Sequence, residues 1–259
     1  MRKEVRRVLG SCSALLFIGL LAQALCVLPA AAEKATPKLV CRAGLGEARR
    51  QELSAQLRAI TGQPGLHFGD DGALDFGKDD PRGGSLTARA LLAAARDGKN
   101  LIIIEDASGR DDVAFCKVVE GSWKGGAQGR PAAFVLLIDF TDFSRVSGDR
   151  EALAAFNAAW GALHEIEHVV HDSADAKGVG EAGECEAAIN LMRRECGLAE
   201  RAEYFYTPMP GAEGGDFKTR FVRLAFERVG PGNKRHRYWL YWDADLTGGF
   251  SDAGQVASK

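Results

Sequence analysis

The sequence predicts an α+β fold in which a small mixed β-sheet packs on helices. Three observations support this expectation: helical spacing of apolar residues in some segments, short apolar strand-like runs in others, and an ordinary globular composition. Of the 259 residues, 46% are apolar and 26% are charged, which excludes a disordered chain, a collagen-like fibre and a polytopic membrane protein. The net charge of −2 gives no sign of nucleic-acid binding, because duplex-binding domains carry a basic excess.

The first 32 residues have the pattern of a secretory signal peptide. Four basic residues stand in the first seven positions, an apolar stretch follows, and Ala30-Ala31-Ala32 forms a small-x-small cleavage site. We expect cleavage after Ala32, which leaves residues 33–259 as one domain, secreted or periplasmic and without a membrane contact. The alternative is an uncleaved membrane anchor, because the apolar run is long enough to span a bilayer with some tilt.

The first half of the domain alternates between helical and strand patterns. A helix is expected over 46–61, where Leu53, Leu57 and Ile60 share one face, and a hairpin over 65–77 around Asp70-Asp71-Gly72. A second helix over 85–96 has Ser85 as its N-cap. Strands are expected over 101–105, 113–119 and 132–140. The last run is apolar throughout, which fits a strand buried on both faces, although an exposed edge that aligns an extended peptide is the alternative.

The second half contains the strongest helical pattern. One helix is expected over 151–172 with Asp149 as its cap, followed by a Gly-rich connection over 174–183 and a second helix ending near Cys196. Strands are expected over 217–228 and 235–242, on either side of a Gly-Pro-Gly-Asn turn. We expect the aromatic residues of the last strand to fill the core.

Four cysteines remain after leader cleavage: Cys41, Cys116, Cys185 and Cys196. An even count in an exported chain predicts two disulfides. Cys185 and Cys196 are eleven residues apart on one helix, roughly 16 Å, so they do not pair with each other. Each is expected to reach Cys41 or Cys116, and the alternative is four buried thiols. No cysteine pair has the close spacing of a zinc site, so metal binding by these residues is not expected.

The residues that carry chemistry are His164, Glu165 and His168, which form H-E-x-x-H. On a helix the two histidines lie one turn apart on the same face, where their imidazoles can hold one Zn²⁺. Glu165 then lies at the rim, where it can act as the catalytic general base. Apolar residues before and after the motif favour a buried site over a solvated polar helix face.

A catalytic zinc ion takes three protein ligands and keeps one position open. His171 lies about 10 Å from His164 along the helix, too far to join the same ion. The next helix offers Glu181, Glu184 and Glu186. We predict Glu186 as the third metal ligand, with Glu184 as the second choice, and Asn190 as a group that hydrogen-bonds a ligand histidine.

The segments HEIEHVVHD and GECEAAINLMRRECGLAERAEY resemble gluzincin-type zinc metallopeptidases, and among them NleD-type effector peptidases and the related domains of bacterial RHS toxins. The resemblance covers about 45 residues and extends over Asn190, Arg194, Glu195, Gly197, Leu198, Arg201 and Tyr204. It implies a zincin-like fold, with a mixed sheet on the HExxH helix and a second ligand-bearing helix. It also implies a Zn²⁺-dependent peptidase that acts on a peptide or protein substrate.

Such an enzyme also needs a donor for the oxyanion of the tetrahedral intermediate. Tyr204, Tyr206 and His236 are the candidates, and each has packing or a surface position as its alternative role. Two other functions remain open: an exported zinc-site or binding domain without catalysis, and a toxin-like peptidase that acts on other cells. The presence of Glu165 argues against the first, because a structural site does not need it.

Overall fold

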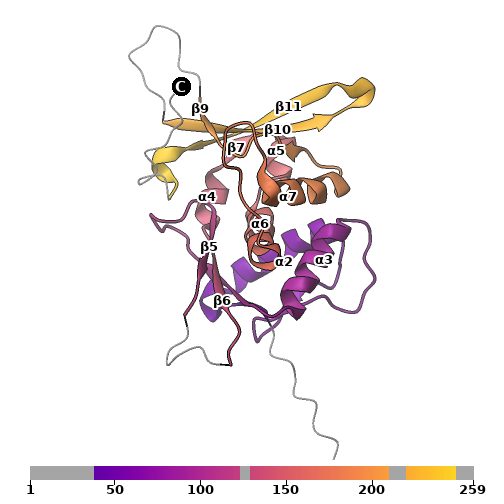
Figure 1. The fold of residues 1–259 in the computed structure, drawn as a ribbon, viewed down its shortest axis with the longest axis vertical. Coiled ribbons are helices and arrows are strands. Elements are labelled where there is room, and N and C mark those ends of the chain that lie inside the picture. Colours follow the sequence, from indigo (N-terminus) through magenta and orange to yellow (C-terminus); the bar gives the residue numbers. More distant parts are fainter. Residues whose placement is uncertain (1–37, 123–128, 210–219, 249–259) are drawn as a thin grey trace, which may run out of the picture. The chain divides into compact units, whose positions relative to one another are not determined.

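The computed structural model describes residues 38–122, 129–209 and 220–248, which form a mixed α+β fold (Figure 1). The expected α+β class is confirmed at this level. Residues Pro37–Lys259 form one compact unit. The predicted signal peptide, and its alternative as an anchor, lie outside the described residues. Within the described ranges, no helix is both long enough and apolar enough to cross a bilayer.

The first sheet has the order β1-β4-β6-β5. Its strands are β1 (Leu39–Cys41), β4 (Leu101–Asp106), β6 (Ala133–Ile138) and β5 (Cys116–Glu120). The first three are parallel and β5 runs antiparallel to β6. The structure confirms an interior position for β6, since it has a partner on both sides, so the alternative of an exposed edge is wrong. The edge strand next to β6 is β5.

Two helices predicted from periodicity cover this sheet: α2 (Glu47–Thr61) and α3 (Leu86–Asp97). The Ser85 hydroxyl caps α3 by accepting a hydrogen bond from the Ala88 amide at 2.9 Å. The expected hairpin is the short pair β2 (His67–Phe68) and β3 (Leu74–Asp75). Apolar residues of both helices and of β4 join one core cluster.

The single helix expected over 151–172 is wrong, because the chain forms two helices there, α5 (Arg150–Ala154) and α6 (Ala158–His171). A further helix, α4 (Phe140–Arg145), precedes them directly after β6. Asn157 breaks the pattern: its backbone is extended and its side chain caps α6 by accepting from the amides of Ala159 and Trp160. Asp149 makes no side-chain cap bond and instead accepts from the Trp239 amide.

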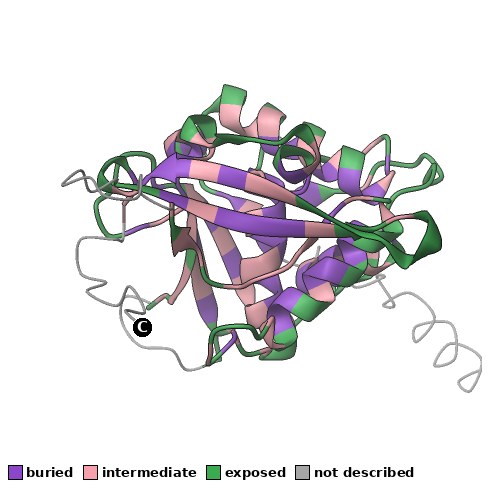
Figure 2. Cartoon of the chain, turned by 90° about the horizontal axis from the view of Figure 1, so that it is seen from above, coloured by how far each residue is buried: buried purple, intermediate pink, exposed green. Residues whose placement is uncertain are grey.

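The second sheet is built on a long antiparallel hairpin, β10 (Phe221–Val229) and β11 (Arg235–Asp243), with the 3-10 turn η2 (Pro231–Asn233) between them. Three two-residue strands extend it: β7 (Ser147–Gly148), β8 (Glu200–Arg201) and β9 (Thr207–Pro208). They are too short to leave a pattern in the sequence. The turn end of the hairpin is exposed, whereas its other end is buried (Figure 2). Two further 3-10 turns are η1 (Ala43–Leu45) and η3 (Ala244–Leu246).

Helix α6 lies between the two sheets (Figure 1) and is followed by α7 (Gly183–Glu195), which ends where predicted. Four rings join the sheets beside the N-terminal half of α6. Phe115 contacts Phe143, Phe156 and Trp242 with centroid separations of 5.1–5.3 Å. As the core residues of the last strand were expected to do, Trp242 packs inward and is 3% exposed.

All four described cysteines are free, so the two disulfides expected from their even number do not form. Cys41 and Cys185 are buried, and Cys116 and Cys196 are half-buried, which agrees with the alternative of buried thiols. Burial raises the pKa of the Cys41 thiol to about 12, which makes it an unreactive core residue.

Candidate metal centre

The HExxH residues lie on α6 with the two imidazoles on one face, as predicted. The ring centroids of His164 and His168 are 4.8 Å apart. Nδ1 of His168 lies 2.6 Å from the carbonyl oxygen of Ser173, which fixes that ring and turns its Nε2 away from the helix end. The side chains of His164 and His168 are 12% and 20% exposed, so the site is shielded but open to solvent.

Asp175 completes the pair. Its Oδ1 lies 3.1 Å from Nε2 of His164 and 3.3 Å from Nε2 of His168. Zinc ligands at about 2.0–2.2 Å in a tetrahedron are about 3.4 Å from one another, so both distances from Asp175 are close to those between ligands of a shared ion. Burial alone raises the pKa of Asp175, but hydrogen bonds from the two histidines outweigh it and hold the pKa well below its ordinary value.

The loop between α6 and α7 brings Asp175 into place. An isolated bridge joins Asp175 to Gly183, and the Cys185 amide donates to the Ala174 carbonyl at 3.1 Å. Gly183 has a φ of +78°, and a Cβ there would lie 2.4 Å from the Ala176 amide nitrogen. Only glycine fits this position, and its missing side chain allows the backbone of Asp175 to contact the start of α7.

Cys185 is the fourth member of the group. Its thiol is fully buried in the first turn of α7 and donates to the carbonyl oxygen of His164 at 3.3 Å. Together, His164, His168, Asp175 and Cys185 offer ligand atoms that all lie within 4.8 Å of one another, and this group could hold a metal ion. The expectation that the cysteines take no part in a metal site stays a prediction, but Cys185 lies where it could supply a ligand.

Glu165 lies beside this group without joining it. Its Oε2 accepts a hydrogen bond from the Val118 amide of edge strand β5 at 3.0 Å. Burial raises the pKa of Glu165, although the neighbouring His164 and His168 act in the opposite direction. A partly desolvated carboxylate next to a metal group is a stronger base than an exposed one.

The predicted third ligand, Glu186, is not a member of the group. It is 1% exposed, and its carboxylate forms ion pairs with Arg193 and with Arg201, the latter at 3.0 Å. One oxygen also lies 3.4 Å from Nδ1 of His164, on the side of the ring that faces away from Asp175. Burial alone raises the pKa of Glu186, but the two guanidiniums outweigh it and hold the pKa well below its ordinary value. Glu186 therefore orients a histidine from behind.

The other glutamates considered, Glu181 and Glu184, are exposed, and Glu184 accepts from the Ala174 amide at 3.4 Å. Asn190 was predicted to hydrogen-bond one of the two motif histidines, and this prediction is wrong. Its oxygen accepts from Arg193 and from the Arg201 amide, and its nitrogen donates to the Arg201 carbonyl. Asn190 therefore contacts the site only indirectly: it hydrogen-bonds Arg193 and Arg201, and these two arginines pair with Glu186.

The three candidates for the oxyanion donor occupy different positions relative to the metal group. The Tyr204 ring stacks on His164 with centroids 6.1 Å apart, and burial, together with the neighbouring Asp175, raises the pKa of its hydroxyl. Tyr206 is half-buried against Trp242 and borders the neighbouring pocket. His236 is exposed in β11 opposite Arg228 and borders neither the pocket nor the metal group. His171, which was excluded as a ligand, pairs with Glu167 at 2.9 Å.

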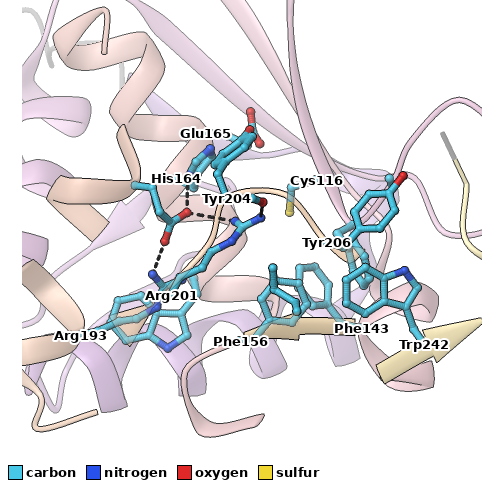
Figure 3. A pocket seen from close by; sticks show the side chains of 16 residues that line it. Cys116, Phe143, Phe156, His164, Glu165, Arg193, Arg201, Tyr204, Tyr206 and Trp242 are labelled. Atoms are coloured by element: carbon cyan, nitrogen blue, oxygen red, sulfur yellow. Dashed lines mark hydrogen bonds and ion pairs between the residues drawn. The ribbon is translucent and has the colours of Figure 1, made fainter. Parts of the chain in front are cut away.

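A pocket of about 160 Å³ opens next to His164 and Glu165 (Figure 3). Seven of its sixteen lining residues are phenylalanine, tyrosine or tryptophan, and in Figure 3 Tyr206, Phe143 and Trp242 stand on the side away from His164 and Glu165. Glu186, Arg193 and Arg201 also line it, and both arginines pair with Glu186.

Sequence reasoning missed Asp175 and Cys185. The search for a third ligand looked for a glutamate on the next helix, whereas Asp175 lies in the connecting loop, seven residues after His168. An aspartate close behind the motif was an available signal. Cys185 left no signal of its own, because its partners are two histidines and an aspartate from other segments.

Comparison with known proteins finds no relative: no protein-family model, curated protein or solved structure matches this chain.

Proposed function

We propose that this protein is a zinc-dependent hydrolase of peptide bonds. The observation that carries the proposal is the position of Glu165, a half-buried carboxylate beside a preformed His164–His168–Asp175 group but outside it. A purely structural site has no use for such a neighbour, whereas a hydrolase needs a base at this place.

The donor set fits zinc better than the other common divalent ions. Two imidazoles with a carboxylate and a nearby thiol suit Zn²⁺, whereas Mg²⁺ and Ca²⁺ prefer oxygen ligands alone. When bound, zinc lowers the pKa of water and polarises a carbonyl. His164, His168 and Asp175 would hold it, and Glu186 would keep His164 in orientation.

The chain's own residues supply the proton transfers. Glu165 accepts a proton from the attacking water on its carboxylate and delivers it to the leaving amine nitrogen. The Val118 amide donates a hydrogen bond to Glu165 and so holds its carboxylate between β5 and α6. Tyr204 faces the same space and is our choice of donor to the developing oxyanion, in preference to Tyr206 and His236.

The resemblance to gluzincins and the mixed sheet behind α6 support the zincin-like part of the proposal. The ligand set departs from that resemblance, because an aspartate in the loop replaces a glutamate on the following helix. Of the matched residues, Asn190, Arg201 and Tyr204 gather around the site. Arg194 pairs with Glu200, and Glu195 hydrogen-bonds Ser85 and Thr87 at the start of α3.

The test combines metal analysis with peptide cleavage. We expect about one zinc per purified chain and cleavage of a peptide library. In Glu165→Gln the metal is retained and cleavage falls on the order of 10²–10⁴-fold, the usual contribution of a general base. Glu181→Gln, an exposed loop carboxylate, is the matched control and keeps full activity. Full activity in Glu165→Gln would overturn the proposal.

Cys185 favours one other candidate, a closed structural zinc site without catalysis. If the thiol turned from the His164 carbonyl onto the ion, all four positions would be filled. Cys185→Ala separates the two. The hydrolase proposal expects metal and cleavage to persist, since three ligands remain. A closed structural site instead loses most of its affinity and cuts no peptide in either form.

Export is part of the proposal and depends on the sequence pattern of residues 1–32. We propose a secreted or periplasmic location, where the enzyme meets peptide or protein substrates. The N-terminal residue of the mature protein, read after expression with the native leader, tests it: Glu33 is expected. A toxin-like role is distinguished by growth arrest when residues 33–259 are expressed without the leader.

A further inference from the structure

The pocket beside Glu165 has the size and lining of a binding site for one side chain. Its volume is about 160 Å³, and an apolar cavity of about 150 Å³ is enough to take up benzene. Phe115, Phe143, Phe156 and Trp242 supply rings to its wall, and Leu224 adds an aliphatic surface. A benzene-sized group therefore fits both the volume and the chemistry.

The pocket is contiguous with the proposed reaction centre. His164 and Glu165 belong to its lining, so a group bound there lies beside the atoms that act on the peptide bond. Gly161, one turn before His164, gives the pocket its closed side. A Cβ at Gly161 would lie 2.6 Å from Cys116 Sγ and 3.0 Å from the Phe143 ring, so α6 approaches β5 and α4 without a side chain between them.

Two arginines of the lining share one carboxylate. The Arg201 guanidinium donates to Glu186, to the Glu203 carbonyl at 3.2 Å and to the Tyr204 carbonyl. Arg193 is 2% exposed, and its guanidinium donates to Glu186, to Asn190 and to the Ala155 carbonyl. The N–H groups that make these bonds are occupied and do not serve a substrate carboxylate. Together with Glu186 the two arginines leave one net positive charge, and Glu165 adds a carboxylate on the side of the proposed reaction centre.

We infer that this pocket selects substrates with a large apolar side chain, aromatic above all, adjacent to the bond that is cut. The inference depends on the proposed function for the reaction, but the binding preference can be measured without it. Aromatic pocket walls bind rings through apolar burial and through edge-to-face contacts of the kind already present between Phe115 and Trp242.

The binding test uses two carboxylates on the zinc-loaded protein, 3-phenylpropionate and propionate. Calorimetry is expected to give at least about a tenfold lower Kd for the phenyl compound, the gain typical of filling an apolar pocket. In Ala114→Leu, a half-exposed lining position, this ratio is expected to fall towards one. Ala94→Leu, on the exposed face of α3, is the control and keeps the ratio.

The cleavage test uses peptides that differ at one position next to the cut. Phenylalanine, tyrosine and leucine are expected to exceed alanine and aspartate by at least about tenfold in kcat/KM, and Ala114→Leu is expected to reduce the preference. Tyr206→Ala provides a second variant at the wall. Equal Kd values for the two carboxylates, or a preference for small or charged residues, would overturn the inference. If no peptide is cut while the phenyl preference persists, the binding assignment stands and only the reaction is wrong.

Discussion

At the scale of single residues, the site separates ligands from the groups that position them. Asp175 and Glu186 are both carboxylates in contact with His164, but they approach opposite ring nitrogens. Glu186 forms ion pairs with the guanidiniums of Arg193 and Arg201. The side chain of Asp175 is 40% exposed, and its carboxylate contacts both histidines. Substitution of Asp175 should therefore affect zinc affinity, whereas substitution of Glu186 should affect the stability of the fold.

We expect Asp175→Ala to lose most of its bound zinc with little loss of stability, because it removes a partly exposed ligand. Zinc competition against a chelator measures the affinity, which should fall by more than the 10–100-fold typical of a supporting residue. Glu181→Ala is the control, an exposed acid in the same connection between α6 and α7. Unchanged zinc affinity in Asp175→Ala would exclude it as a ligand.

We expect Glu186→Gln to unfold more easily instead. Removing one partner of a buried ion pair leaves uncompensated charge and typically costs about 3–5 kcal/mol in the free energy of unfolding. Urea titration measures this cost. A folded Glu186→Gln protein without zinc would contradict the assignment and restore Glu186 as a ligand.

The same pair makes stability depend on pH. The pKa of Glu186 is lowered in the folded protein, so its contribution is complete above the unfolded value of about 4.3 and is lost as the pH falls below it. Wild-type stability should therefore drop below about pH 4, and Glu186→Gln should show a smaller drop. Parallel curves for the two proteins would refute this linkage.

At the scale of elements, the site depends on how the loop after α6 meets α7. Helix α6 by itself places two imidazoles and one carboxylate. The bridge between Asp175 and Gly183 brings the Asp175 carboxylate to the histidines, and the first turn of α7 adds Cys185 to this group. A change in this junction should affect the metal group before it affects the rest of the fold.

We expect Gly183→Ala to reduce zinc affinity sharply. The new Cβ meets the backbone of Asp175 and Ala176 at 2.4–2.7 Å, so the loop must shift and carry Asp175 with it. Gly180→Ala is a matched control in the same loop: its φ is also positive, +88°, but nothing lies within 4 Å of the added Cβ. Both variants carry the left-handed strain, which costs about 1 kcal/mol. Equal zinc affinities in the two would show that the junction does not position Asp175.

At the scale of the whole molecule, the aromatic contacts beside α6 connect the two sheets. Phe156, in the break before α6, contacts Phe115 before β5, Phe143 in α4 and Phe226 in β10. The residues that line the pocket are therefore also those that join the two halves of the described fold.

We expect Phe156→Ala to destabilise the protein by about 3 kcal/mol, near the lower end of the range for large-to-small aromatic substitutions, because Phe156 is half-buried. Leu86→Ala, at a position 66% exposed, is the control and should change little. Urea unfolding followed by tryptophan fluorescence and by circular dichroism checks both. Non-coincident transitions in the wild type would mean that the two sheets unfold separately.

The sequence alone determined what depends on local periodicity and local chemistry. The positions of α2, α3, α7 and the β10–β11 hairpin follow from apolar spacing and turn residues, and the HExxH histidines share a face because a helix places residues four apart together. The predicted helix over 151–172 was wrong because one asparagine cap outweighed the apolar pattern around it. That competition is local but finely balanced.

Only the tertiary structure decided which acids and thiols reach the histidines. Asp175, Cys185 and Glu186 lie within eleven residues of sequence, yet one is a shared neighbour of both imidazoles, one a buried thiol and one an ion-pair partner behind the site. The position of Asp175 depends on the close contact of its loop with Gly183. The role of Glu186 depends on Arg201 in β8, which donates to its carboxylate. The physical reason is that helix periodicity fixes directions within one element, whereas a ligand set is closed by contacts between elements, which no single segment of the sequence specifies.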